Sequence, residues 1–196
     1  WSSDVCSSDL TSVNPNWKIS YKEAGTKYYL NIDNNFEFLL FCNNDVKILN
    51  NVIYGMLKIF KESKKIGTLG ARLHFDDNTV QHDGMIGLIN KDNAFAITHK
   101  SLRSYYNHSI FQKTSLGNTG ALMMIRKEVF IKCGMFNEKY LSCFEDVELN
   151  MRCLLQGLIN ITDSELVAYH YESLSRNEDS EKLNKLHLDY TQVLLP

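Results

Sequence analysis

The feature that most constrains this chain is a short apolar run that stops abruptly at polar side chains. Residues 36–42 end in Phe38-Leu39-Leu40-Phe41-Cys42, and Asn43, Asn44 and Asp45 follow at once. An apolar and aromatic run bounded by turn-forming residues predicts a buried β-strand. In open α/β sheets ligands bind beyond the carboxyl ends of the strands, so Asp45 would stand where a ligand binds. A plain turn that ends the strand accounts for the same residues.

Length and composition are those of an ordinary globular domain. The chain has 196 residues, of which 44% are hydrophobic and 22% charged, and its formal net charge is -2. This length fits one domain with a sizeable core, and the charge gives no indication of nucleic acid as a partner. No apolar run approaches the roughly 20 residues of a membrane-spanning helix, and no secretory signal is visible. Five cysteines without a C-x-x-C pair indicate reduced thiols, so the chain is expected in the cytoplasm.

Further elements are predicted from apolar periodicity and from turn residues. Helical spacing predicts helices over about 49–64 and 126–133, and a last amphipathic helix over 180–195. Strands are predicted at 66–75, as a short pair around Gly84 within 80–89, and at 122–125, 159–161 and 166–168. Residues 90–113 have no firm pattern and are interpreted as a long surface or active-site loop.

A second acidic pair, Glu145-Asp146, opens the clearest predicted helix, over 145–156. Its expected apolar stripe consists of Val147, Met151, Leu154 and Leu155. Acidic residues at a helix N-terminus interact favourably with the helix dipole, and this alone accounts for one of the two. A carboxylate held at a fixed point can also act as a general base. Asp146 is therefore the candidate base, and Glu145 would orient an acceptor or tune Asp146.

The remaining candidates are a metal residue, a histidine with an arginine, and a glycine-rich loop. Asp45 suffices for Mg²⁺ or Mn²⁺, because magnesium needs only one or two carboxylates beside waters and phosphates. His170 could bind a metal or a phosphate oxygen, and the planar fork of Arg176 suits a phosphate, although a lone histidine is more often structural. The loop of Gly117, Asn118, Thr119 and Gly120 would let a sugar or diphosphate approach the backbone closely, or it is a plain loop.

Taken in order, these residues form a series of motifs. The series comprises Asn43-Asn44-Asp45, Thr79-Val80-Gln81-His82-Asp83-Gly84, residues 120–130, Gly134-x-Phe136-Asn137-Glu138, Phe144-Glu145-Asp146-Val147-Glu148-Leu149-x-x-Arg152 and His170-Tyr171-Glu172-Ser173-x-Ser175-Arg176. Each motif is weak alone, but the ordered series over about 36–176 resembles glycosyltransferase family 2. The similarity is greatest to its bacterial rhamnosyltransferase-like and O-antigen-type members.

The resemblance implies a GT-A fold, a Rossmann-like α/β three-layer sandwich with a mixed, mainly parallel sheet. It implies inverting transfer of a sugar from a nucleotide-sugar donor to a hydroxyl of a glycan or lipid-linked acceptor, in cell-surface polysaccharide synthesis, with Mg²⁺ or Mn²⁺ as cofactor. In this sequence Asp45 would be the metal residue, with Asn43 where the family motif has an acid, and His170 a metal or diphosphate contact. Asp146 would be the base. The donor or acceptor would contact Asn43, Asn44, Gly117, Asn118, Thr119, Gly120 and Arg176.

The chain departs from the family pattern at its start. Family members begin with a βαβ unit that holds the nucleotide, and residues 11–35 show no such unit. Residues 1–10 look foreign, so the expected organisation is a non-native scar at 1–10, an N-terminally truncated GT-A domain at 11–178 lacking the first βαβ unit, and a C-terminal helix at 179–196. A peripheral contact with the inner face of the membrane would suit a lipid-linked acceptor.

Two other functions remain as alternatives. A non-catalytic or inactive nucleotide-sugar-binding fragment would account for the missing unit and for Asn43. A metal-dependent phosphoesterase would need more carboxylates and histidines near Asp45 than the sequence offers.

Overall fold

The computed structural model describes residues 23–24, 27–28, 37–43, 45–49, 51–89, 95–105, 112–137, 140 and 144–171. Its elements in chain order are β1 (Glu23–Ala24), β2 (Lys27–Tyr28), β3 (Phe38–Cys42), β4 (Val46–Ile48), α2 (Val52–Glu62), β5 (Ile66–His74), β6 (Val80–His82), β7 (Met85–Ile89), β8 (Phe95–His99), β9 (Gln112–Ser115), β10 (Leu122–Arg126), α3 (Lys127–Lys132), α4 (Glu145–Leu155) and β11 (Ile159–His170). The predicted helix over 180–195 lies outside the described residues.

One mixed sheet forms the centre of the molecule, in the order β3-β10-β5-β11-β4, with β6 paired to β5 and β9 to β11. This confirms the α/β class. The expectation of mainly parallel pairing is wrong for the described strands, because β5 and β11 are their single parallel pair. The reason is the path of β10. It enters the sheet at the carboxyl end of β3, with Leu122 opposite Cys42, and therefore runs against both of its neighbours.

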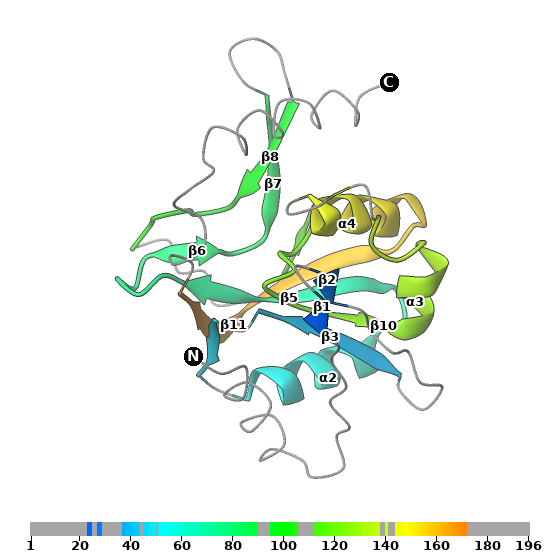
Figure 1. Ribbon diagram of the computed structural model, residues 1–196, viewed down its shortest axis with the longest axis horizontal. Helices are drawn as coiled ribbons and strands as arrows, with labels where there is room; N and C mark the ends of the chain where they lie inside the picture. Colours follow the sequence, from blue (N-terminus) through cyan, green and yellow to red (C-terminus); the bar gives the residue numbers. More distant parts are fainter. Residues whose placement is uncertain are drawn as a thin grey trace.

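Helices cover both faces of this sheet, as a three-layer arrangement requires (Figure 1). Helix α2 packs on one face through its periodic apolar residues, which are Val52, Ile53, Met56, Ile59 and Phe60. Helices α3 and α4 lie on the other face, where their buried residues pack against Met123 and Ile125 of β10. Strand β10 is buried throughout and so contributes to both layers of the core.

Arg126, the last residue of β10, stabilises the end of α2. Its guanidinium donates hydrogen bonds to the carbonyl oxygens of Phe60 and Ser63, which helical hydrogen bonding leaves free at a C-terminus. The guanidinium carbon also lies 4.8 Å from the ring centroid of Phe60 and 5.5 Å from that of Phe38. Arg126 itself is 6% exposed, so this cap is part of the core.

Several local predictions are confirmed and others are wrong. The strands around Gly84, the helices α2, α3 and α4, and the strands β3, β5 and β10 lie where they are predicted. The structure adds β4, and the segment 90–113, interpreted as a loop, contains β8 and the first two residues of β9. The two strands predicted over 159–161 and 166–168 are one strand, β11, whose pairing with β5 shifts between Asp163 and Val167.

The buried face of α4 also differs from its predicted stripe. Leu155 is 84% exposed, whereas Leu149, Asn150 and Cys153 are fully buried beside Val147. The apolar pattern failed because a polar residue, Asn150, occupies the centre of the inward face.

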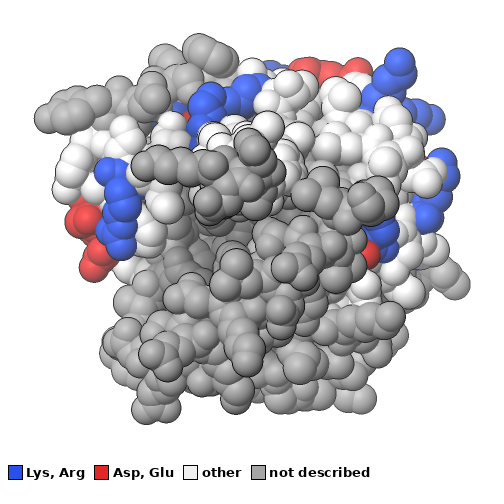
Figure 2. Space-filling model, turned by 90° about the horizontal axis from the view of Figure 1, so that it is seen from above, with Lys and Arg blue, Asp and Glu red and all other residues white. Residues whose placement is uncertain are grey.

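The remaining described parts lie at the surface. The antiparallel β7–β8 ribbon projects away from the central sheet (Figure 1). Figure 2 shows that Lys and Arg lie interspersed with Asp and Glu on the described part of the face it presents. Among the described residues, none of the helices combines the length and apolar character that crossing a bilayer requires.

Candidate active site

Polar side chains converge where β3 and β11 end and β10 begins. The three strands meet at one edge of the sheet, because β3 and β11 run in the same direction and β10 runs against β3. The backbone N–H of Asn43, just after β3, donates to the carbonyl oxygen of Ala121, just before β10, at 2.9 Å. His170 ends β11 opposite Val46, the first residue of β4. The predicted carboxyl-edge site is therefore assembled here from residues far apart in sequence.

Asn43, Asp45 and His170 form the first half of the site. Nε2 of His170 lies 3.1 Å from Oδ1 of Asp45 and 3.2 Å from Nδ2 of Asn43. On the other side of the ring, Nδ1 of His170 lies 2.8 Å from Oε1 of Gln81. His170 is 7% exposed, whereas the Asp45 side chain is 38% exposed. The arrangement leaves the carboxylate open to a ligand and holds the imidazole firmly behind it.

The hydrogen bonds define the protonation of His170. Nδ1 carries the proton and donates it to Gln81, while Nε2 accepts the amide hydrogen of Asn43. Oδ1 of Asp45 is buried and accepts no hydrogen bond from any described residue, so its short distance to Nε2 brings two electron-rich atoms together. Such a pair is unfavourable unless a cation or a proton lies between the atoms. A carboxylate and an imidazole held by its other nitrogen fit a divalent metal ion, which would replace the Asn43 amide on Nε2.

Asp146 forms the second half of the site. Its Oδ2 accepts the backbone N–H of Gly120 at 2.8 Å, and its Oδ1 accepts the N–H of Val147 at 2.7 Å. Asp146 therefore lies in the first turn of α4 with its carboxylate orientation fixed by two amides. Phe144, immediately before the helix, is buried and has a φ of 74°, a conformation that is strained for an aromatic residue. The strain is maintained where the chain must turn into the helix that carries the candidate base.

Gly120 and Ala121 connect the two halves. Gly120 binds Asp146 through its N–H, and Ala121 binds Asn43 through its carbonyl oxygen. Two residues span at most about 7 Å, so Asp146 and Asn43 attach to one short stretch of backbone. Glu145 is half-buried beside Asp146. Thr119 is also half-buried, and its Oγ1 accepts the N–H of Ala121 at 3.3 Å.

Asn118 and Gly117 hold the loop from within the core. Asn118 is fully buried, and its Nδ2 donates to Thr68 Oγ1 at 3.0 Å and to the Ile161 carbonyl at 2.9 Å. A Cβ on Gly117 would lie 2.6 Å from Cβ of Asn150, so glycine lets the loop pack against α4. The expectation that Asn118 contacts a donor or acceptor is corrected, because its side chain is directed into the core and its amide is used there.

Two predicted site residues are not described by the structure, and two residues without a predicted role lie at the site. Asn44 and Arg176 lie outside the described residues. Within the described part of the chain, no group of three or more His, Cys, Asp and Glu side chains is placed to bind a metal, so Asp45 and His170 stand as a pair. Gln81 and His82 lie against the site but were assigned no role from sequence. The signal available was their place in the motif over 79–84.

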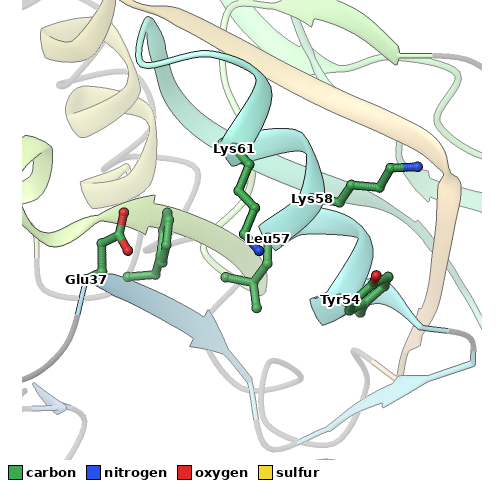
Figure 3. A pocket seen from close by; sticks show the side chains of 6 residues that line it. Glu37, Tyr54, Leu57, Lys58 and Lys61 are labelled. Atoms are coloured by element: carbon green, nitrogen blue, oxygen red, sulfur yellow. The ribbon is translucent and has the colours of Figure 1, made fainter.

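A separate pocket lies away from this edge (Figure 3). It is lined by residues before and at the start of β3 and along α2, which are Glu37, Phe38, Tyr54, Leu57, Lys58 and Lys61. Phe38 opens β3 and Asn43 follows its last residue, so the pocket lies at the opposite end of that strand. It contains none of the candidate site residues.

Relatives in sequence are bacterial proteins. The chain is 30% identical over 151 residues to the O-antigen biosynthesis protein RfbC of Myxococcus xanthus, an alignment that covers 74% of this chain and 12% of that protein. It is 25% identical over 146 residues to the uncharacterized protein y4gI of Sinorhizobium fredii, covering 73% of this chain and 16% of that protein. The chain thus spans less than a fifth of the length of these relatives. No protein-family model matches it.

The fold has a counterpart among solved structures. A crystal structure of GalNAc-T7 with UDP, GalNAc and Mn²⁺ superimposes with a TM-score of 0.51 and 11% sequence identity, over 71% of this chain and 28% of that one. At this identity the likeness concerns the fold alone. Together with the relationship to RfbC, it confirms the fold and the resemblance that the motif series predicted. The chain therefore has the GT-A fold and is related in sequence to a bacterial O-antigen biosynthesis protein.

Proposed function

We propose that this domain transfers a sugar, with inversion, from a nucleotide-sugar donor to a hydroxyl of a glycan or lipid-linked acceptor in surface-polysaccharide synthesis. One observation carries the proposal. Asp146 binds the N–H of Gly120, and Asn43, whose side chain contacts His170 of the Asp45–His170 pair, binds the carbonyl oxygen of Ala121, so adjacent backbone residues join the two halves. A cation site beside an oriented carboxylate would serve both the leaving diphosphate and the attacking hydroxyl of an inverting transfer.

Asp146 acts as the base in this reaction. Its carboxylate takes the proton of the acceptor hydroxyl while that oxygen attacks the anomeric carbon on the face opposite the diphosphate. The bond from the anomeric carbon to the diphosphate oxygen breaks, and its electron pair leaves with the diphosphate. The N–H groups of Gly120 and Val147 hold the carboxylate in a fixed orientation throughout, which lowers the cost of aligning the reacting groups.

Asp45 and His170 would hold the metal ion, with Asn43 beside them. When bound, the ion would neutralise charge on the departing diphosphate. A site of one carboxylate and one imidazole favours Mn²⁺ over Mg²⁺, because Mg²⁺ prefers oxygen ligands alone. Mn²⁺ is also the ion in the GalNAc-T7 crystal structure. Glu145, Thr119 and the Gly120 backbone would meet the sugar or the acceptor.

The base assignment is tested by release of nucleoside diphosphate from a panel of nucleotide-sugars with Mn²⁺ and candidate acceptors. Asp146→Asn should lower transfer about 10²–10⁴-fold, the usual contribution of a general base. Glu128→Gln is the matched control, an acid-to-amide change in the first turn of α3. Unchanged transfer by the Asp146→Asn protein would remove Asp146 from the mechanism.

The metal assignment is tested by calorimetry. Asp45→Ala should abolish the metal-dependent part of donor binding. Equal metal-dependent donor binding by the wild type and by Asp45→Ala would refute the assignment. A second candidate function, donor binding without transfer, is favoured by the amide of Asn43 on Nε2 of His170, which occupies the atom that would bind the ion. Metal-dependent donor binding without turnover on any acceptor would support that candidate.

A further inference from the structure

Strand β6 lies behind the candidate site and contributes nothing to the chemistry proposed above. Gln81 and His82 are adjacent polar residues on it, 5% and 0% exposed. Burying an amide and an imidazole is costly unless both are hydrogen-bonded. Both side chains are hydrogen-bonded, Gln81 to His170 in the first half of the site and His82 to the loop that binds Asp146 in the second half.

The strand is irregular at Gln81. His82 lies opposite Leu73 of β5, and Val80 lies opposite the next residue, His74, so β6 has one residue more than its partner over this step. Gln81 is the extra residue of a β-bulge. In a regular strand neighbouring side chains point to opposite faces of the sheet, and a bulge breaks this alternation and re-aims a side chain. The bulge allows two consecutive side chains to reach the same site.

Gln81 determines the state of His170. Its Oε1 accepts the Nδ1–H of the imidazole at 2.8 Å, which leaves Nε2 as the nitrogen that faces Asp45. A hydrogen bond of this kind fixes both the tautomer and the ring orientation of a metal-binding histidine.

His82 determines the position of the loop that holds Asp146. Its Nε2 accepts the N–H of Thr119 at 3.4 Å, and the next N–H along the chain, that of Gly120, binds Asp146. Nδ1 of His82 therefore carries the proton, and it lies 2.7 Å from Nδ1 of His99 on β8. Burial, followed by the nearby charge of His99, keeps the pKa of His82 well below its usual value, which maintains the neutral acceptor form.

We propose that Gln81 and His82 are positioning residues through which β6 sets the two halves of the site separately. Gln81 orients His170 for the metal ion, and His82 orients the Thr119–Gly120 backbone that presents Asp146. The inference rests on the proposed function for its chemical meaning, but the two contacts can be tested without any sugar transfer.

The test uses the whole 196-residue chain, labelled for NMR, with one apolar and one conservative variant at each position. Gln81→Leu should allow the His170 ring to populate both tautomers, visible in its ring nitrogen shifts, and Gln81→Glu should restore the Nδ1–H form. His82→Leu should speed hydrogen exchange of the Thr119 and Gly120 amides about tenfold, and His82→Gln should restore part of the protection. Ile59→Val controls for a general loss of stability, because Ile59 is a buried residue of α2, which covers the face of the sheet opposite to α4.

Binding of Mn²⁺ alone, followed by electron paramagnetic resonance, links these contacts to the site. Gln81→Leu should weaken Mn²⁺ binding about 10–100-fold, the usual cost of losing a partner of a metal-binding histidine. His82→Leu should leave it unchanged. Variants that each disturb both halves, or that disturb neither, would overturn the inference. Equal Mn²⁺ binding by the wild type and Asp45→Asn would instead refute the proposed metal site, while the tautomer and exchange data still decide whether β6 positions the two halves.

Discussion

A network of buried asparagines joins the site loop to the core, and its members should contribute unequally to stability. Asn150 of α4 hydrogen-bonds the backbone of Asn118 on both sides, accepting its N–H at 3.1 Å and donating to its carbonyl oxygen at 2.8 Å. Oδ1 of Asn150 also accepts the hydroxyl of Thr68. Asn150→Ala would therefore leave two backbone groups and one hydroxyl without their partner in a fully buried region.

The cost follows from the number of groups left unsatisfied. Each buried polar group without a partner costs roughly 1–3 kcal/mol, so Asn150→Ala should lower the free energy of unfolding by about 3–6 kcal/mol after partial relief by water. Asn118→Ala should cost about 1–3 kcal/mol, because the Thr68 and Thr162 hydroxyls retain other partners. Typical domains have only about 5–15 kcal/mol in total, so the first variant is close to unfolding.

Urea unfolding of the two variants measures this difference, provided that the slope with denaturant is unchanged. Leu155→Ala is the matched control, because this residue of the same helix is 84% exposed and its truncation should change stability by less than about 0.5 kcal/mol. Equal losses for Asn118→Ala and Asn150→Ala, or a larger loss for Asn118→Ala, would refute the account of how the loop is held.

Three further predictions concern the cap, the buried histidine and the glycines. Arg126→Ala should lower the free energy of unfolding by about 2–4 kcal/mol in urea melts, because it removes charged hydrogen bonds to two carbonyl groups at the end of α2. The pKa of His82 is lowered in the folded state, so on acidification the unfolded chain binds the proton before the folded one. The free energy of unfolding should therefore decrease as the pH is lowered from about 6.5, by up to about 1.4 kcal/mol per pH unit. His82→Gln should remove that part of the slope in urea melts at successive pH values. Gly70→Ala should cost about 1–3 kcal/mol by thermal unfolding, since its Cβ would lie 2.3 Å from Oδ1 of Asn118. Gly120→Ala should fold as the wild type does, because a Cβ at this position would lie no nearer than 3.6 Å to any neighbouring side-chain or backbone atom.

Local pattern was sufficient for the elements whose periodicity matches their burial. Helix α2 and the strands β3, β5 and β10 are rich in apolar residues, and all four were predicted, although β5 and β10 also bury Thr68, Arg72 and Arg126. Strands β8 and β9 were not, because they are partly exposed and lack a clear apolar pattern, and β9 pairs with β11, a strand far along the chain. The same cause explains the sheet, whose mostly antiparallel pairing depends on where β10 enters and not on its own sequence.

The carboxylates of the candidate site were predictable from the sequence, but the side chains that hold the site in place were not. Asp45 and Asp146 were identified because a strand end and a helix start are visible in sequence. Asn118 was assigned to ligand binding, since an amide in a glycine-rich loop looks the same whether it faces a sugar or the core. Gln81 and His82 were overlooked because nothing local indicates that a bulge directs both toward one edge.

Some motif residues that carry the family resemblance hold the fold together. Arg152 donates to the carbonyl oxygens of Cys133 and Met135 and pairs with Glu148, which also accepts a bond from Asn137. Gly134 has a φ of 84°, and a Cβ there would lie 2.9 Å from Nη1 of Arg152. This part of the motif series therefore fastens the segment after α3 to the helix that carries Asp146.

The bond between Asn43 and His170 joins residues 127 positions apart, near the two ends of the described sheet. During synthesis at the ribosome, the strand that ends at Cys42 emerges long before its partner across the site exists. A nascent chain can therefore have most of its sheet and still lack any place for a cation. The proposed cation site should form in a single late step, when β11 is inserted between β5 and β4.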